Sequence, residues 1–262
     1  MRAYMQQIEQ SIASAFVNDR LAIHLCGGIQ GPHTLTFGVK LYQGTKANIA
    51  KAMSLGPAIE GYSGISPVRM YRENGLILVE LPSPEPVIID GTRYTGDGLA
   101  VPVGLTGRRA IIGVDFDSDP HLALVGPTKR GKTVAQRGIA FHLARQNRPS
   151  QVRFIFSTFK DWEWEAYGKL PHTMAVINEP SETETMIHWL VSTMRERLHQ
   201  RIQLPHLFLF LDDLLNLLGE IDVATEIGQL ASLGRGVGIH LVIGTQRLNE
   251  AGSGGAIIHG NM

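Results

Sequence analysis

The sequence predicts an α/β protein in two parts, a larger domain built on a mostly parallel sheet and a smaller α+β domain before it. The larger domain is predicted by short apolar runs that alternate with longer helical segments in the second half of the chain. A glycine-rich turn between the first of these runs and the next helical segment supports the same fold. Strand-like runs and a tight-turn dipeptide in the first third predict the smaller domain.

The smaller domain is expected to begin with an amphipathic helix over residues 5–16, because Ile8, Ile12 and Phe16 recur at helical spacing. Its β-like runs lie at residues 21–25, 34–41, 68–72 and 76–81. An Asn74-Gly75 step separates the last two runs and predicts a hairpin with a tight turn.

A second short helix is expected over residues 47–53. Thr45 can cap its start, and the Gly56-Pro57 step is expected to end it. A group of prolines that ends at Pro86 then interrupts the pattern, so we place the domain boundary there.

The smaller domain is thus assigned to residues 1–86 and the larger domain to residues 87–262. Strands of the larger domain are expected near residues 122–125, 152–156, 207–211 and 239–244. Helices are expected to begin near Lys132, Ser181 and Val223. Strands that alternate with helices in this way are typical of a parallel sheet.

Residues 126–133, GPTKRGKT, satisfy the phosphate-binding pattern G-x-x-x-x-G-K-[ST] between an apolar run and a helical segment. Glycines let backbone N–H groups turn toward phosphate oxygens, and the following helix contributes its positive end. Lys132 is expected to neutralise the β- and γ-phosphates, and the Thr133 hydroxyl to bind Mg²⁺. The predicted ATP-binding residues are Gly126, Pro127, Thr128, Lys129, Arg130, Gly131, Lys132 and Thr133.

A pair of carboxylates, Asp212 and Asp213, follows the apolar run LFLFL. Ligands of parallel sheets bind beyond the carboxyl ends of the strands, where this pair is expected to lie. Asp212 is therefore a candidate to organise Mg²⁺ with Thr133, and Asp213 is a candidate to orient or deprotonate the attacking water. The alternative is a pair of helix-capping or surface carboxylates.

Polar residues also flank the last predicted strand. Gln246 follows it and is a candidate sensor of the γ-phosphate, since an amide both donates and accepts hydrogen bonds. Arg235 precedes it in a glycine-rich loop and is a candidate arginine finger that reaches across a subunit boundary. A solvated loop arginine is the alternative for Arg235, and His240 is expected to be a hydrogen-bonded core or edge histidine and not a catalyst.

The composition neither suggests nor excludes nucleic acid. Lys plus Arg and Asp plus Glu both number 24, so the formal net charge is zero and gives no support to a broad basic surface. Cys26 is the only cysteine, which fits a reducing, cytoplasmic setting, and it is expected to be a small buried filler. The first residues lack a long apolar stretch, so a signal peptide is not expected, and any membrane contact is expected through segments absent from this chain.

Several segments together resemble the motor of FtsK/SpoIIIE-type DNA translocases: HLALVGPTKRGKT, VRFIFSTFKDWE, LPHLFLFLDDLLNLL and GRGVGIHLVIGTQR. The upstream segments GPHTLTFGVKLYQGTKANIAKA and GISPVRMYRENGLILVELP are similar to the β domain that precedes that motor. The resemblance covers nearly the whole chain. It implies a RecA-like P-loop core that, as a homo-hexameric ring, threads double-stranded DNA and hydrolyses ATP with Mg²⁺ at subunit interfaces.

The chain departs from that family's pattern in three places. The usual Asp-Glu pair is Asp212-Asp213 here, so slow hydrolysis is one expectation. Lys129 and Arg130 stand where the family usually carries Gly-Ser, and Lys129 lacks the backbone freedom of glycine. The sequence also stops at Met262, before the family's C-terminal end, so a fragment or a reduced homologue is expected.

Two other functions stay open at this point. One is a conjugation or secretion motor of the same superfamily, which moves a nucleoprotein or a polypeptide. The other is an ATP-binding assembly subunit that hydrolyses weakly because of Asp213. Stimulation of hydrolysis by duplex DNA separates the first from a DNA translocase, and an Asp213→Glu variant tests the second.

Overall fold

The computed structural model describes residues 2–85, 90–106 and 110–246. Contacts divide the chain into two compact units, residues 1–90 with 104–112 and residues 91–103 with 113–262. The predicted boundary at Pro86 lies outside the described residues.

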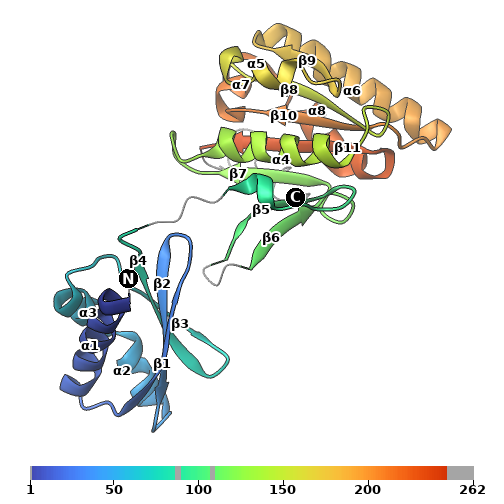
Figure 1. Cartoon of the computed structure of the whole chain (residues 1–262). Helices are drawn as coiled ribbons and strands as arrows, with labels where there is room; N and C mark the ends of the chain where they lie inside the picture. Colours follow the sequence, from blue (N-terminus) through green and yellow to red (C-terminus); the bar gives the residue numbers. More distant parts are fainter. Residues whose placement is uncertain (1, 86–89, 107–109, 247–262) are drawn as a thin grey trace. The chain divides into compact units, whose positions relative to one another are not determined.

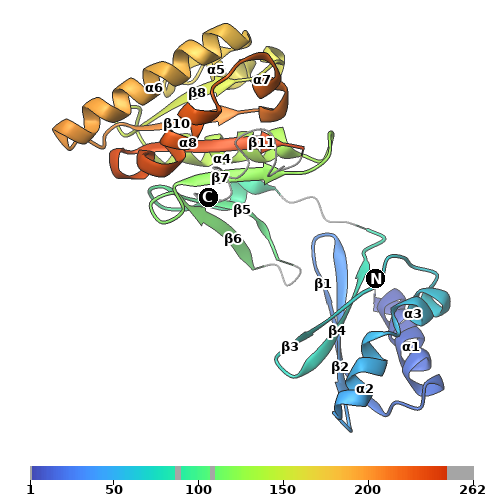
Figure 2. The ribbon, with the colours of Figure 1, turned by 180° about the vertical axis from the view of Figure 1, so that it is seen from behind.

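The first unit is an antiparallel sheet of four strands in the order β1-β2-β4-β3, with helices on one face (Figures 1 and 2). Its strands are β1 (Ile23–Gln30), β2 (Thr34–Leu41), β3 (Arg69–Glu73) and β4 (Leu76–Pro82). Its helices are α1 (Arg2–Asn18), α2 (Lys46–Met53) and α3 (Gly56–Ser63). The core forms where Ile12 and Phe16 of α1 pack with Phe37 of β2 and Val79 of β4.

The hairpin and the capped helix of this unit are confirmed. Asn74 and Gly75 have φ angles of 49° and 78°, the positive values that a two-residue hairpin turn requires. The Thr45 side chain accepts a hydrogen bond from the backbone N–H of Asn48 at 3.2 Å, so it caps α2.

The helix α2 ends at Met53, as expected. Gly56-Pro57 also begins α3, which the sequence did not predict, because proline suits the first turn of a helix, where its missing N–H is not needed. One expectation for this unit is wrong. Cys26 is exposed and not a buried filler. Leu25 packs on the core, and successive side chains of a strand point to opposite faces, so its neighbour Cys26 faces away.

The second unit contains a parallel five-stranded sheet in the order β7-β11-β10-β8-β9. These strands are β7 (His121–Val125), β8 (Val152–Ser157), β9 (Thr173–Ile177), β10 (His206–Leu211) and β11 (Ile239–Thr245). Its helices are α4 (Lys132–Gln146), α5 (Glu165–Gly168), α6 (Pro180–Gln200), α7 (Leu214–Glu220) and α8 (Ala224–Leu233). The short turns are η1 (Gly91–Arg93), η2 (Asp161–Glu163) and η3 (Gly234–Val237). The strands β5 (Ala100–Leu105) and β6 (Ile111–Asp115) form a separate two-stranded sheet, of which residues 104–105 and 111–112 belong to the first unit.

Alternate residues of the central strand β10 build two cores. Phe208 and Phe210 face α4 and pack with its Ile139. Leu209 and Leu211 face the opposite side, where α6, α7 and α8 pack on the sheet. Figures 1 and 2 show these layers from the two sides. Both faces of the sheet are thus covered, which is why its strands are continuous apolar runs.

The predicted fold class is confirmed, with a P-loop α/β core and a smaller α+β unit before it. Sequence analysis missed strands β5, β6 and β9 and helices α3, α5 and α7. The missed elements are short, and β9 lies at the edge of the sheet.

Candidate nucleotide-binding site

The glycine-rich loop joins the end of β7 to the start of α4. Its first residue is tied to the neighbouring strand, since the Gly126 N–H donates to the Thr245 carbonyl at 3.1 Å. Gly131 caps α4 with a φ of 89°, a left-handed conformation that favours glycine. The loop therefore ends at a helix N-terminus, where anions bind well.

Lys129 also adopts the left-handed conformation, with a φ of 62°. A side chain in this region costs about 1 to 2 kcal/mol relative to its preferred conformations. A hollow lies next to the loop, and Thr128 and Lys129 are among the residues that line it. Arg130 is exposed and does not line this hollow. The Lys129 backbone is thus held in a strained shape at the candidate site, as is common where ligands bind.

Lys132, the first residue of α4, folds back over the loop. Its Nζ donates to the carbonyl oxygens of Gly126 and Pro127, at 2.8 and 3.2 Å. Lys132 also lines the hollow next to the loop, so its ammonium group lies beside this hollow. An ammonium group at this position can bind phosphate oxygens and neutralise their charge.

Thr133 and Asp212 meet across the sheet edge. The Thr133 hydroxyl donates to Asp212 Oδ2 at 2.9 Å, and the Asp212 N–H donates to the Ser157 carbonyl at 3.0 Å. Burial raises the pKa of Asp212, and the nearby carboxylates of Glu163 and Asp213 act in the same direction, against the hydrogen bond from Thr133. A bound cation beside Asp212 would offset this cost of carrying a buried charge.

Asp213 stands at the start of α7 with a φ of 60° and a ψ of 56°. Its Oδ2 accepts a hydrogen bond from Asn216 Nδ2 at 2.7 Å. Its Oδ1 is buried and has no hydrogen-bond partner among the described residues. A buried carboxylate oxygen without a donor is costly unless a water or ligand satisfies it, and Asp213 lines the same hollow as Lys132 and Asp212.

Gln246 reaches this hollow from the end of β11. Residues after four strands of the sheet line this hollow, and the sequence prediction used three of them, β7, β10 and β11. The fourth is the end of β8, where Thr158, Phe159 and Lys160 also line the hollow. Sequence analysis missed these three residues and Asn216, although the rule that ligands bind beyond strand carboxyl ends also applies to β8.

Gln136 is a further residue that sequence analysis missed. It lies on α4, is fully buried, and its Nε2 donates to the carbonyl oxygens of Leu211 and Val242 at 3.0 and 3.1 Å. Leu211 directly precedes Asp212, so Gln136 links the helix of the P-loop to the strand that carries the metal candidate. A glutamine in the helical pattern gives no local signal of these distant partners.

Arg235 does not join the other candidates within one chain. It is exposed in η3, before the amino end of β11, whereas Gln246 follows the carboxyl end. The seven residues of β11 separate the two ends by roughly 20 Å. The structure therefore gives Arg235 no contact with the phosphate site of its own chain.

The site fits a nucleotide with Mg²⁺. A helix N-terminus and Lys132 provide positive charge for phosphates, and Thr133 with Asp212 provides the oxygen ligands that Mg²⁺ prefers. Mg²⁺ bound to nucleotides uses few protein ligands, so the absence of a larger His, Cys, Asp and Glu cluster in the described parts of the chain is compatible with it.

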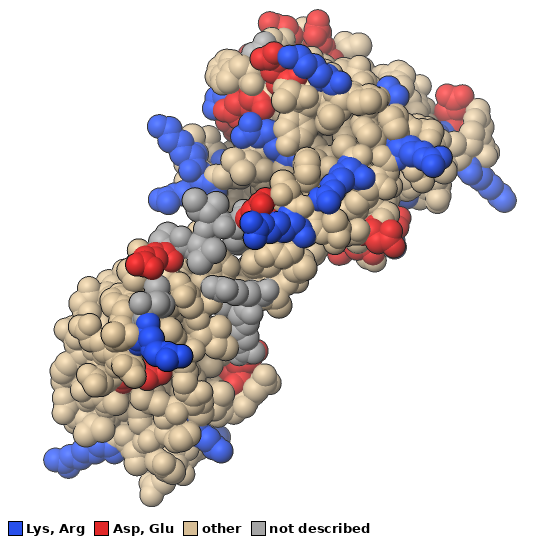
Figure 3. Space-filling view, viewed as in Figure 1, with Lys and Arg blue, Asp and Glu red and all other residues tan. Residues whose placement is uncertain are grey.

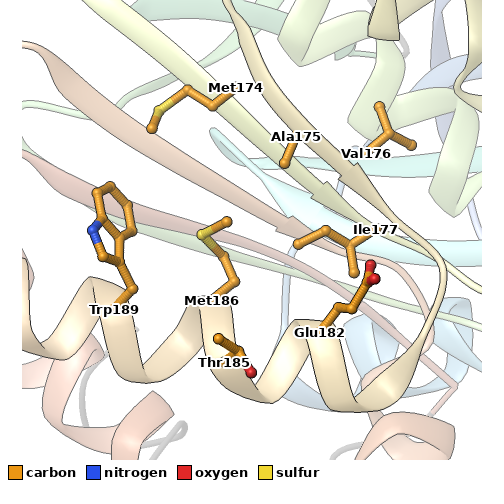
Figure 4. A pocket seen from close by; sticks show the side chains of 8 residues that line it. All are labelled: Met174, Ala175, Val176, Ile177, Glu182, Thr185, Met186 and Trp189. Carbon is orange, nitrogen blue, oxygen red and sulfur yellow. The ribbon is translucent and has the colours of Figure 1, made fainter.

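A second hollow, of about 530 Å³, lies between β9 and α6 (Figure 4). Figure 4 shows Met174 above Trp189 and Met186, with Glu182 at one end. Its lining is mostly apolar and contains a carboxylate but neither Lys nor Arg. It is therefore unsuited to a triphosphate, although it is roomier than the hollow at the P-loop.

Comparison with known sequences supports the predicted resemblance. Residues 92–204 match the sequence profile of the FtsK/SpoIIIE family. The matched segment is less than half of the chain, which is therefore similar to this family over these residues. The chain is 26% identical to DNA translocase FtsK of Chlamydia pneumoniae over 92% of its length, and 25% identical to DNA translocase FtsK of Lactococcus lactis over 84%. It spans about a third, 34%, of each of these relatives.

Two solved structures share the architecture of this chain. The conjugation coupling protein TcpA of pCW3, in its monomer form with ATPγS, matches 97% of this chain and 81% of its own with a TM-score of 0.60. The cytoplasmic domain of the type VII secretion ATPase EccC of Thermomonospora curvata matches 78% of this chain and 24% of its own with a TM-score of 0.55. At 21% and 17% identity these matches establish the fold alone. Across the described residues, none of the helices combines the length and apolar character that a membrane crossing needs.

Proposed function

We propose that this chain is the motor part of an ATP-driven translocase that moves double-stranded DNA and works as a homo-hexameric ring. One observation carries the proposal. Lys132, Thr133 and Asp212 come together at the carboxyl edge of a parallel sheet, with Thr133 and Asp212 joined by a 2.9 Å hydrogen bond. Curated relatives named DNA translocase FtsK support DNA as the cargo.

In the proposed reaction the loop 126–133 holds the phosphates of ATP, and Lys132 neutralises the β- and γ-phosphates. Thr133 and Asp212 hold Mg²⁺, which supplies charge compensation for phosphoryl transfer when bound. Asp213 orients or deprotonates the attacking water, with Asn216 fixing one of its oxygens. No covalent nucleophile is required, since the protein's work is positioning and electrostatic stabilisation.

Two candidates complete the proposed site. Gln246 lies beyond the end of β11 and lines the hollow, where its amide can bond a γ-phosphate. Arg235 is proposed to act on the nucleotide of the neighbouring subunit. Its place at the opposite edge of the sheet supports this choice, because in its own subunit it lies far from the phosphate site.

DNA contact is proposed to use a few cations and not a broad basic surface. On the face shown in Figure 3, Lys and Arg side chains are scattered among Asp and Glu in both units. The formal net charge of zero agrees with this distribution. A ring can still present a few cations of each subunit to duplex DNA in its central hole.

The proposal is tested by ATPase assays with and without duplex DNA. We expect hydrolysis that duplex stimulates in the wild-type protein and no ATP-dependent hydrolysis in Lys132→Ala. Lys169→Ala is the matched control, because Lys169 is an exposed lysine paired with Glu165 at 2.8 Å, outside the site. A rate that does not respond to duplex would argue for the alternative, a conjugation or secretion motor, which the fold shared with TcpA and EccC also accommodates.

A further inference from the structure

Arg197 is a buried arginine outside the nucleotide site. It lies in the last turn of α6, and only 8% of its surface is exposed. Among the described residues no carboxylate forms an ion pair with it, and burial lowers its pKa. A buried charge without a counter-ion is costly, so its hydrogen bonds must compensate.

Backbone carbonyls of two loops supply those bonds. Arg197 Nη1 donates to the carbonyl oxygen of Val237 at 2.9 Å, in η3. It also donates to the carbonyl oxygens of Pro205 at 2.9 Å and Gln203 at 3.3 Å, in the loop before β10. The guanidinium thus ties η3 to the loop 201–205.

Other contacts close the same junction. Gln203 Nε2 donates to the carbonyl oxygen of Gly236 at 3.2 Å. Gly238, which follows η3, has a φ of 66°, and a Cβ at this position would collide with the Gln203 carbonyl oxygen. The Leu207 N–H donates to the Gly238 carbonyl at 2.8 Å. Loop 201–205 and η3 are therefore packed together so closely that one cannot shift without the other.

This clamped turn carries Arg235, whose own side chain is exposed. A residue that acts across a subunit boundary must be held at a fixed place on the surface, because misplacement by about 1 Å can cost roughly a hundredfold in rate. Among the described residues the Arg235 side chain has no hydrogen bond or ion pair of its own, so its place depends on the turn η3, and Arg197 binds the backbone of this turn two residues later, at Val237.

We propose that Arg197 is a positioning residue that holds η3, so that Arg235 is presented to the nucleotide of the adjacent subunit. This inference rests on the proposed function of Arg235 as a finger in trans. It adds that the clamp is needed in the subunit that donates the finger and not in the subunit that binds the ATP.

Mixing two inactive subunits tests this asymmetry. An Arg235→Ala chain keeps its phosphate site but lacks a finger, and a Lys132→Ala chain keeps its finger but lacks a working phosphate site. Neither is expected to hydrolyse ATP alone, and an equal mixture is expected to recover duplex-stimulated hydrolysis. This recovery is the reference against which Arg197 is measured.

Arg197→Met is then placed in one chain at a time. In the Lys132→Ala chain it is expected to lower the recovered rate by roughly tenfold or more, because the finger loses its fixed place. In the Arg235→Ala chain it is expected to leave the recovered rate within about twofold. Arg197→Lys, which keeps the charge and one donor group, gives an intermediate loss in the first chain and covers the case in which the methionine variant does not fold.

The control is Arg195→Met in the same two chains. Arg195 lies on the same helix but is exposed, where it bonds Gln229 at 3.3 Å. It is expected to leave the recovered rate unchanged in both chains.

Each other result overturns a specific statement. If the reference mixture does not recover activity, the finger in trans is wrong and the role of Arg197 is wrong with it. If the mixture recovers and the Arg197 variants cost the same in either chain, Arg197 supports only the fold. If they cost nothing in either chain, η3 needs no clamp.

Discussion

Thr133 and Asp212 lie 79 positions apart in the chain, yet the Thr133 hydroxyl donates to Asp212 Oδ2 at 2.9 Å. Thr133 belongs to the first turn of α4, and Asp212 follows the end of β10. The bond joins the loop that is proposed to hold phosphate to the strand that is proposed to hold the metal. Substitutions on either side should therefore separate metal-dependent binding from stability of the fold.

Asp212→Asn is expected to stabilise the free protein at neutral pH while it abolishes Mg²⁺-dependent hydrolysis. Burial raises the pKa of Asp212, so the folded protein holds this proton to a higher pH than the unfolded chain does. Stability is therefore lost as the pH rises through the raised pKa, and asparagine removes that loss. Thermal unfolding followed by tryptophan fluorescence at pH 5 and pH 8 measures this effect, since buried Trp164 reports on the second unit.

The same thermal unfolding experiments, repeated with Mg²⁺ and ATP, test whether Asp212 takes part in binding the metal and the nucleotide. Ligand that binds only the folded state raises the melting temperature, so the wild-type protein should gain stability with Mg²⁺-ATP. Asp212→Asn should show a much smaller gain. An equal gain in both proteins would remove Asp212 from the proposed metal site.

Asp213→Glu is expected to speed single-turnover hydrolysis and to lower the melting temperature. Asp213 carries a φ of 60°, a conformation in which Asp is tolerated better than Glu. The longer side chain, in contrast, brings the carboxylate one methylene closer to an attacking water. Rapid-quench measurement of one turnover checks the rate, and Asp213→Asn serves as the variant without a base.

A glutamate variant slower than wild type would contradict the idea that Asp213 limits the reaction. If wild type and Asp213→Asn hydrolyse equally slowly, the assembly-subunit alternative gains support, because the carboxylate then adds nothing to turnover.

The parts of the site that sequence analysis found share one physical cause. The carboxyl ends of parallel strands meet at one edge, so a polar residue after each continuous apolar run marks the site. Asp212 and Gln246 were found in this way and line one hollow. The P-loop was found because its glycines and Lys132 occur at a fixed spacing before a helix.

What sequence analysis missed depends on contacts between distant segments. Gln136 donates to the carbonyl oxygens of Leu211 and Val242, which lie 75 and 106 positions further along the chain. Nothing near Gln136 in the sequence indicates either partner. Arg197 donates a hydrogen bond to the carbonyl oxygen of Val237, 40 positions away. From the sequence alone, a single arginine near the end of a helix is expected to be a solvated group. The start of α3 was missed because Gly-Pro both ends and begins helices, and tertiary packing of Ile59 decides between them.

Gln136→Leu is expected to destabilise the second unit and to slow hydrolysis without weakening ATP binding. Leucine keeps the volume but leaves the carbonyls of Leu211 and Val242 without their side-chain donor, at a cost of about 1 to 3 kcal/mol. Urea unfolding followed by tryptophan fluorescence measures the stability change. The kinetic expectation is a lower kcat with an unchanged KM for ATP.

Gln136→Glu is the companion variant. It keeps the shape but replaces the donor with an acceptor that faces two carbonyl oxygens, so it should be worse than leucine. Equal stability of glutamine and leucine proteins would show that the packing of this side chain, and not its hydrogen bonds, holds β10 and β11 at the site.

The histidines at the amino ends of the strands should make the second unit sensitive to acid. Burial lowers the pKa of His121 to about 4 and that of His240 to about 3. His240 Nδ1 lies 3.0 Å from the Pro120 carbonyl, and its Nε2 lies 2.9 Å from His206 Nδ1. Between about pH 6.5 and 4 these imidazoles are protonated in the unfolded chain but stay neutral in the folded protein. The free energy of unfolding therefore falls as the pH drops through this range.

For His121 alone, the difference between 6.5 and about 4 corresponds to about 3 kcal/mol lost across that range. His121→Asn should flatten the pH dependence by this order, because asparagine can still accept the bond that the Leu241 N–H donates to His121 Nδ1 at 3.1 Å. Urea unfolding at a series of pH values, with tryptophan fluorescence as the signal, measures the slope. His24→Asn is the control, since His24 is an exposed residue of β1 in the first unit and should leave the slope unchanged. A slope that is identical in wild type and His121→Asn would mean that His121 charges freely in the folded protein and that acid acts elsewhere.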